Sequence, residues 1–191
     1  MQVNYCLTCG TPLETRLIGD SDRRACPKCD FVYWGNYSIG VGALLFKEKR
    51  VLLVRRAQNP GKGYWTNPGG FIEQFETIEE TVEREVWEET GIKAKIRSIV
   101  ALRDQPRDPH NLYVAFSMDY VEGEPKADGV EVDGAGFFSY EETLQMNVAP
   151  FTRWLLEIAF HGKDPGLWPD THAAEPMPAK GLFKISTEQK E

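Results

Sequence analysis

Three acids near the end of one predicted helix have the residue types and the spacing of a metal site. Glu85, Glu88 and Glu89 are related as i, i+3 and i+4, so their side chains project from the same side of a helix. Like charges at this spacing repel one another, and the negative end of the helix dipole opposes them further. A divalent cation would reverse this penalty, because carboxylate oxygens suit Mg²⁺ and Mn²⁺. The alternative interpretation is a solvated acidic face.

The helix that must position these acids is predicted to begin after Thr77. Thr77 and Glu80 have the spacing of a capping box, and Gly91 suits the left-handed position that follows a last turn. Arg84 precedes Glu88 by four residues and is expected to hold its carboxylate in position. An apolar stripe with a spacing of four residues runs along the helix and consists of Ile78, Val82 and Val86. The side of the helix that carries the three acids overlaps this stripe.

The whole stretch resembles the Nudix box, G-x5-E-x7-R-E-(apolar)-x-E-E-x-G-(apolar). It matches every fixed position of that pattern: Gly70, Glu76, Arg84, Glu85, Val86, Glu88, Glu89, Gly91 and Ile92. The resemblance runs from about residue 37 to residue 161 and implies a Nudix hydrolase, an α/β protein built as an α/β/α sandwich with a mixed sheet. It also implies that the three helix acids hold Mg²⁺ or Mn²⁺ together with a backbone carbonyl of Gly69 or Gly70. Arg84 would orient the acids, and Glu76 would assist.

Further candidates for the site lie outside the box. Many Nudix enzymes use a glutamate from a later loop to contact metal or activate water, which makes Glu131 a candidate general base. A surface acid at a strand edge is the alternative for Glu131. Asn67 stands where the family usually has an apolar residue before Pro-Gly-Gly, a departure expected to affect the nearby pocket rather than the metal site. Four arginines are candidates for binding substrate phosphates, although the first two also suit solvated strand ends: Arg55, Arg56, Arg103 and Arg107.

The four cysteines form two C-x2-C pairs separated by sixteen residues: Cys6, Cys9, Cys26 and Cys29. This spacing is typical of a Cys₄ zinc site, and a closed shell of four thiolates is structural rather than catalytic. Disulfides or redox-active pairs are the alternatives, which the apparent lack of a secretory signal disfavours. Residues 1–34 resemble a zinc ribbon and hold four basic and four acidic side chains. An architectural or dimer-forming role is therefore favoured over nucleic-acid binding.

The rest of the chain completes a three-part prediction: a zinc ribbon at 1–34, a Nudix hydrolase domain at 35–162 and a polar C-terminal tail at 163–191. Apolar runs predict strands at 39–46, 51–54, 94–102, 112–120 and 130–138, and charge and proline predict a loop at 103–110. Ser139 and Glu142 predict a second capping box that begins a short helix. Pro150 is expected to begin a further helix that ends at Gly162.

Composition limits the partners. The chain of 191 residues has 22 basic and 29 acidic side chains, a net charge of −7, which argues against non-specific binding to nucleic acid or to an anionic membrane. No apolar run approaches the roughly 18 residues of a membrane span. A cytoplasmic protein with a small nucleotide substrate is expected, with neither a nucleic acid nor a membrane as partner. Family analogy predicts a homodimer.

The resemblance implies hydrolysis of a nucleoside diphosphate linked to another group. A zinc ribbon ahead of a Nudix domain resembles NADH pyrophosphatases, but those carry a Ser-Gln-Pro-Trp-Trp-like motif where this chain has Asp104-Gln105-Pro106-Arg107. The short layout also resembles a group that includes plant enzymes cleaving ADP-ribose and FAD, and Pro109 lies near a proline position of ADP-ribose enzymes. ADP-ribose or FAD, releasing AMP, is the first expectation and NADH the second. A non-catalytic nucleotide sensor or regulator is the alternative from another class.

Overall fold

The computed structural model of the chain describes residues 3–161, 168–169 and 182–184. The chain divides into two compact units, one comprising Met1–Tyr37 with Pro106–His110 and the other comprising Ser38–Gln105 with Asn111–Glu191. The tail predicted at 163–191 lies outside the described residues, except for 168–169 and 182–184, and so does the predicted helix end at Gly162. Within the described part of the chain, no helix combines the length and the apolar composition that crossing a membrane requires.

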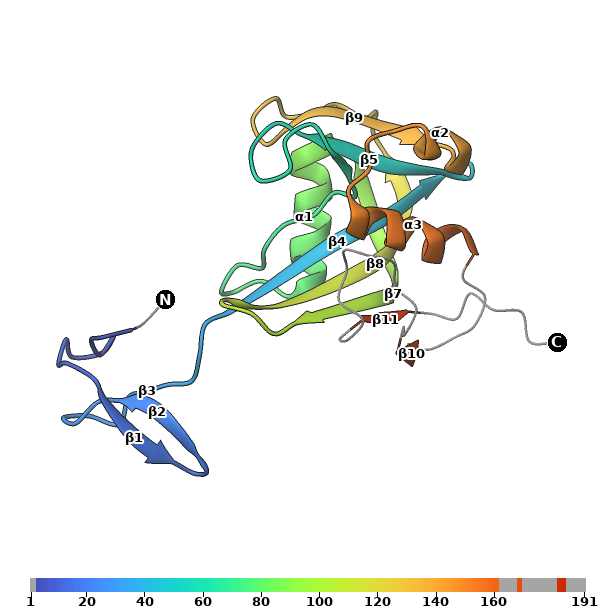
Figure 1. Cartoon of the computed structure of the whole chain (residues 1–191). Helices are drawn as coiled ribbons and strands as arrows, with labels where there is room; N and C mark the ends of the chain where they lie inside the picture. The colour runs from blue at the N-terminus through green and yellow to red at the C-terminus, as the bar shows by residue number, and fades with distance from the viewer. Residues whose placement is uncertain (1–2, 162–167, 170–181, 185–191) are drawn as a thin grey trace. The chain divides into compact units, whose positions relative to one another are not determined.

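The N-terminal unit is a small antiparallel sheet beside two cysteine turns (Figure 1). Its strands pair in the order β1-β2-β3: β1 (Glu14–Ile18), β2 (Ser21–Ala25) and β3 (Val32–Tyr33). The buried residues that pack together in this unit are Cys6, Leu13 and Cys26, with Phe31 and Tyr33 partly buried against them. A core of this size gives little hydrophobic stabilisation, so the unit depends on another source of stability.

In the part of the chain that the structure describes, the second unit is organised around an eight-stranded sheet. Its order is β10-β11-β7-β8-β4-β5-β6, and β9 also pairs with β5. Its strands are β4 (Tyr37–Lys47), β5 (Arg50–Arg56), β6 (Trp65–Thr66), β7 (Lys93–Gln105), β8 (His110–Glu122), β9 (Val132–Phe138), β10 (Trp168–Pro169) and β11 (Leu182–Lys184). A two-residue turn joins β4 to β5, because Glu48 and Lys49 both have positive φ and allow the tight primed turn that a twisted hairpin favours.

Among its described residues, three helices complete this unit: α1 (Ile78–Thr90), α2 (Tyr140–Leu144) and α3 (Pro150–His161). Both predicted capping boxes are confirmed, with Thr77 and Glu80 at the start of α1 and Ser139 and Glu142 at the start of α2. Gly91 ends α1 in the left-handed conformation, as the sequence predicts. These local signals fix where the helices start and stop, and hence which α1 residues reach the sheet.

The helices cover opposite faces of the sheet, which is the predicted α/β/α sandwich (Figure 1). The alternation along β4 shows the two layers, since Val41 and Leu45 pack with Val82 and Val86 of α1. Leu44, between them in sequence, packs instead with residues of α3 such as Leu155. The period of two in the strand thus divides its apolar side chains between two cores.

The predicted loop at 103–110 is too long. Arg103, Asp104 and Gln105 extend β7 and pair with residues of β8, and His110 already belongs to β8, so the connection is residues 106–109. The charge of this segment is compatible with a strand because the Arg103 guanidinium carbon lies 4.1 Å from the centre of the Phe151 ring. Packing on an aromatic side chain from α3 overrides the local loop signal.

Candidate functional site

Arg84 of α1 connects three other residues that the sequence analysis selected. Its Nε donates to Glu76 Oε1 at 2.9 Å, and its Nη2 donates to Glu76 Oε2 at 3.0 Å. Its Nη1 donates to Glu85 Oε1 at 3.0 Å and to Glu88 Oε2 at 2.9 Å. The predicted pair with Glu88 is thus present, and hydrogen bonds from Arg84 hold the pKa of Glu76 below its usual value. Arg84 fixes three carboxylates around one guanidinium.

Glu89 is the most buried acid of this group, with 7% of its surface exposed. Its Oε2 accepts a hydrogen bond of 2.9 Å from the backbone N–H of Gly69. Burial raises the pKa of Glu89 to about 8, an effect that the Gly69 hydrogen bond opposes and that the nearby Glu85 increases. A buried carboxylate with so little positive charge beside it is the arrangement that a bound cation would relieve.

The glycine turn before α1 leaves room for Glu85. A Cβ on Gly70 would overlap the carboxylate of Glu85 in its present position, so a side chain here would displace that carboxylate. Burial also raises the pKa of Glu85, although the Arg84 guanidinium acts in the opposite direction. Glycine at position 70 thus allows the backbone of the turn and the acids of the helix to approach one another.

These groups line one open cavity of about 350 Å³. Its wall contains six acids, one arginine, a glycine and a phenylalanine: Gly70, Phe71, Glu73, Arg84, Glu85, Glu88, Glu89, Asp128 and Glu131. Glu131, the predicted candidate base, therefore faces the same space as the helix acids. Six carboxylates against one guanidinium repel any phosphate unless cations are also present. This donor set of hard oxygens fits Mg²⁺ or Mn²⁺.

Three residues of the cavity were missed by the sequence analysis: Phe71, Glu73 and Asp128. Asp128 has a definite structural role, because its Oδ1 accepts from the backbone N–H groups of Val130, Glu131 and Val132 at 2.8, 3.0 and 3.0 Å. It therefore fixes the loop that presents Glu131. The Asp-Gly pair at 128–129 is a turn signal in the sequence, but only the pairing of β9 with β5 brings that turn to α1.

The four candidate phosphate-binding arginines lie outside the lining of this cavity. Arg55 Nε donates to Asp133 Oδ1 at 2.6 Å, and Arg56 Nε donates to the carbonyl of Pro60 at 2.9 Å. Arg103 donates to Asn111 Oδ1 at 2.8 Å. Arg107 lines a separate hollow of about 300 Å³ in the N-terminal unit. Gly69 and Glu76 do not line the acidic cavity. Gly69 is hydrogen-bonded to the lining residue Glu89, and Glu76 to the lining residue Arg84.

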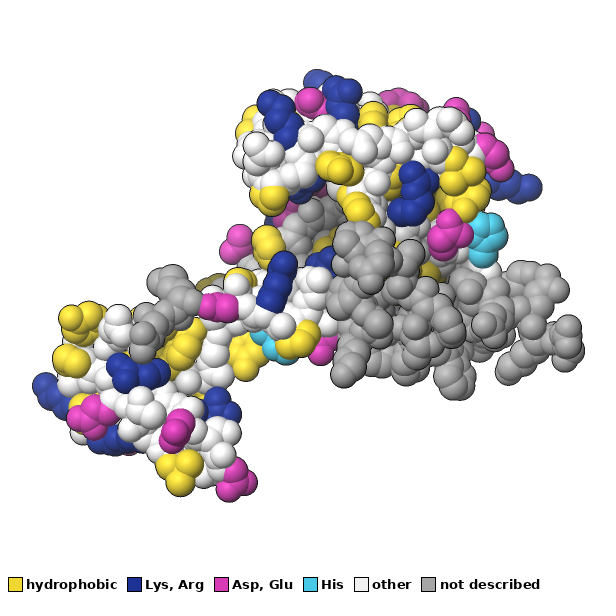
Figure 2. Space-filling view, viewed as in Figure 1, with side chains coloured by type: hydrophobic (Ala, Val, Ile, Leu, Met, Phe, Trp, Pro, Cys, Tyr) yellow, Lys and Arg dark blue, Asp and Glu magenta, His cyan; other side chains and the backbone are white. Residues whose placement is uncertain are grey.

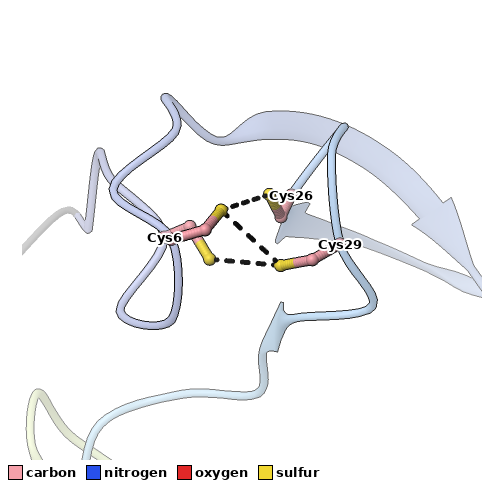
Figure 3. A group of neighbouring side chains, drawn as sticks. Cys6, Cys26 and Cys29 are labelled. Carbon is pink, nitrogen blue, oxygen red and sulfur yellow. Dashed lines mark hydrogen bonds between the residues drawn. The ribbon is translucent and has the colours of Figure 1, made fainter.

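The four cysteines of the N-terminal unit converge, with all four Sγ atoms within 4.8 Å of one another. Figure 3 shows the Sγ atoms of Cys6, Cys26 and Cys29 pointing toward a common centre. The Cys6–Cys29, Cys9–Cys26 and Cys9–Cys29 sulfur distances are 3.5, 3.6 and 3.7 Å, and all four thiols are free. Four sulfurs around tetrahedral zinc are about 3.8 Å apart, given Zn–S bonds of about 2.3 Å. The cluster therefore fits zinc.

The surface of the N-terminal unit carries both signs of charge. Figure 2 shows basic and acidic side chains interspersed over its visible face rather than one basic patch. Its aromatic residues are partly exposed, and the Arg23 guanidinium carbon lies 4.7 Å from the centre of the Trp34 ring. The visible face does not have the charge asymmetry typical of a nucleic-acid-binding surface.

The sequence of this chain is similar to those of several known proteins. A family model described as NUDIX domain matches residues 36–157. An ADP-ribose pyrophosphatase from Methanocaldococcus jannaschii is 40% identical over 104 residues, which cover 53% of this chain and 61% of that protein. A NAD-capped RNA hydrolase NudC from Chromobacterium violaceum is 34% identical over 137 residues, which cover 72% of this chain and 50% of that protein. The chain thus spans about half to three-fifths of the length of these curated relatives.

A solved structure supports the same grouping. A NUDIX hydrolase from Nitrosomonas europaea has a TM-score of 0.71 and 29% sequence identity to this chain. The match covers 83% of this chain and 93% of the solved one. The structural similarity therefore extends over most of the chain and is not confined to the acidic helix.

Proposed function

Because the chain belongs to the Nudix family, we propose that it hydrolyses the pyrophosphate bond of a nucleoside diphosphate linked to another group, using Mg²⁺ or Mn²⁺. The observation that carries this proposal is the cavity walled by six acids, one arginine and the glycine turn. A purely electrostatic pocket for phosphate would be basic, whereas an acidic pocket suits phosphate only when divalent cations bridge the two.

The roles of the residues follow from their contacts. Glu85, Glu88 and Glu89 would hold the divalent ion, which neutralises the diphosphate and polarises phosphorus for attack by water. Arg84 keeps the helix carboxylates in place through its hydrogen bonds. Glu131 lines the same cavity and is our candidate for accepting the proton of the attacking water. Water adds to one phosphorus as the bond from that phosphorus to the bridging oxygen breaks, so two phosphate monoesters leave.

ADP-ribose or FAD is the proposed substrate, which gives AMP with ribose 5-phosphate or with FMN. Support comes from the 40% identity to an ADP-ribose pyrophosphatase. NADH is the second candidate, because the relatives named NudC match a larger share of this chain. Those relatives are described as hydrolases of NAD-capped RNA, so the predicted absence of a nucleic-acid partner needs its own test. We retain the homodimer as a proposal from family analogy.

The test is a substrate panel with the full zinc-loaded chain. ADP-ribose, FAD, NADH, a NAD-capped oligoribonucleotide and a nucleoside triphosphate are each incubated with Mg²⁺ in H₂¹⁸O, and the products are identified by mass spectrometry. We expect AMP from ADP-ribose or FAD at the highest kcat/KM, with one ¹⁸O atom in one of the two monoesters. Preference for NADH or the capped oligonucleotide would select the second candidate.

A sensor would behave differently in the same panel. Tight binding of one compound by calorimetry, without turnover of any, would overturn the proposed hydrolysis. Glu83 provides a matched control because it is an exposed acid of α1 that does not line the cavity. The Glu83→Gln variant should retain full turnover.

A further inference from the structure

Asn67 stands directly before the Pro68-Gly69-Gly70 turn and is buried, with 7% of its surface exposed. Its side chain makes three hydrogen bonds. Nδ2 donates to the Tyr113 hydroxyl at 2.9 Å and to the Pro68 carbonyl at 3.4 Å, and Oδ1 accepts from Thr152 Oγ1 at 3.1 Å. The amide thus joins β8 and α3 to the turn.

The space that Asn67 and Tyr113 occupy is shaped by Gly42 of β4. A Cβ on Gly42 would overlap both the Tyr113 hydroxyl and the Asn67 amide. The polar contact is therefore packed directly against the strand, with no room for a side chain between them. β4 and β8 are neighbours in the sheet, so the amide is held against two adjacent strands.

The turn that follows Asn67 is held against β4 by its backbone. Ala43 N–H donates to the Pro68 carbonyl and Val41 N–H donates to the Gly70 carbonyl, each at 2.9 Å. Between these two anchors lies the Gly69 N–H, which donates to Glu89. The direction of this N–H depends on the orientation of the peptide planes between residues 67 and 70.

We propose that Asn67 is a positioning residue that sets the orientation of this turn, and thereby of the Gly69 N–H that holds Glu89. An apolar residue could fill the same volume, but it would leave the hydroxyls of Tyr113 and Thr152 without their partner. The amide is directional, so it fixes a rotation as well as a distance. This differs from the sequence-based expectation that Asn67 affects the nearby pocket rather than the metal site, because the turn connects Asn67 to Glu89. The consequence for metal affinity rests on the proposed function, whereas the consequence for the Gly69 N–H does not.

The experiment uses the full zinc-loaded chain and two measurements. Hydrogen exchange of the Gly69 amide is followed by NMR without Mg²⁺, and Mn²⁺ binding is followed by the EPR signal of free Mn²⁺. For Asn67→Leu we expect exchange at Gly69 to be about 10-fold faster and the Mn²⁺ Kd to rise about 10-fold. Thr152→Val should do the same, and Thr152→Ser, which keeps the hydroxyl, should restore wild-type values.

Thr143→Val is the matched control. Thr143 is also a fully buried threonine, and its hydroxyl donates to the Tyr140 carbonyl at 2.6 Å, away from the turn. This variant should lower the Tm while leaving both the exchange at Gly69 and the Mn²⁺ Kd unchanged. If Asn67→Leu and Thr152→Val lower the Tm in the same way and change neither measurement, Asn67 is only structural and the proposal is wrong.

Two further outcomes are assigned in advance. If Asn67→Leu does not fold, Thr152→Val and Tyr113→Phe decide the matter, and wild-type exchange at Gly69 in both would overturn the proposal. If wild-type protein binds no Mn²⁺, the proposed function fails, while the exchange rates at Gly69 still decide whether Asn67 orients the turn.

Discussion

The cysteine cluster and the acidic cavity both bring together side chains of types that bind metals, but their arrangements differ. The four Sγ atoms lie within 4.8 Å of one another, and no other group of three or more potential ligands in the described part of the chain converges so closely. The acids instead surround a guanidinium and face an open cavity. A closed set of soft ligands suits a permanent structural ion, whereas an open set of hard ligands leaves room for substrate and water.

The two regions also differ in what supports them. The cysteine cluster lies in a unit whose packed apolar cluster has three buried residues among those described, two of them cysteines. The acidic helix is packed by Val82 and Val86 into a large apolar cluster of the second unit. We therefore expect loss of the first metal to affect folding and loss of the second to affect catalysis.

The largest expected effect is that of Cys26→Ala, because structural zinc contributes on the order of 10 kcal/mol to such small units. Cys26 is buried and belongs to the cluster. We expect the variant to lose its zinc, measured by atomic absorption, and residues 3–37 to become sensitive to protease while residues 38–105 stay protected. Thr8→Ala, an exposed change in the other cysteine turn of the same cluster, is the control. Full zinc content in Cys26→Ala would contradict the assignment of a structural zinc to the cysteine cluster.

Glu88→Gln tests the open site and should reduce kcat by roughly 10²–10³-fold, as loss of a charged group at a reacting centre does. Glu88 is half-exposed and contributes little packing, so the Tm should change by only a few degrees. The comparison is with Glu83→Gln, assayed with the same substrate and Mg²⁺ concentrations. Equal kcat values for the two variants would contradict the assignment of Glu88 to the metal.

A third prediction concerns stability against pH in Mg²⁺-free protein that retains its zinc. The pKa of Glu89 is raised to about 8 in the folded chain, against about 4.3 when unfolded. Between these values only the folded state binds the proton, so wild-type stability should fall as pH rises. Relative to Glu89→Gln, wild-type protein should lose roughly 3 kcal/mol of unfolding free energy between pH 5.5 and 8.5. Urea unfolding measures this, and parallel curves for the two proteins would contradict it.

The smallest expected effect is that of Glu76→Gln, which removes a charge from the outer side of Arg84. Changes to groups that support metal ligands typically cost 10–100-fold in affinity or activity. We expect a loss of about 10-fold in kcat, with a higher Mg²⁺ concentration needed for half-maximal rate. Glu79→Gln removes an exposed acid from the first turn of α1, close in sequence to Glu76, and should leave both quantities unchanged. A loss as large as that of Glu88→Gln would place Glu76 at the metal itself.

Short-range spacing explains which parts of this site the sequence could predict. Residues close together in sequence set the caps of α1 and the common face of its three acids. The same holds for each C-x2-C pair of the cysteine cluster. The pair Arg84–Glu88 follows from helix geometry, but the contact of Arg84 with Glu76 depends on how the preceding loop folds back. Periodicity also placed the strands, with errors at their ends.

Long-range pairing explains the rest. Asp128 reaches the cavity only because β9 pairs with β5, and no local pattern encodes that register. Asn67 was visible as a departure from the family, but its partners Tyr113 and Thr152 lie 46 and 85 residues away. Arg103 was expected in a loop, and its packing on Phe151 keeps it in a strand. These contacts arise from the tertiary fold.

The guanidinium of Arg84 already shares one nitrogen between two acids of the helix. Glu85 and Glu88 would therefore hold a divalent ion from positions that Arg84 already restrains, rather than as loose side chains. The side chains of these acids lose their conformational entropy when the domain folds, so this loss is not repeated in each catalytic cycle. A low magnesium concentration would then slow the proposed reaction without unfolding the domain.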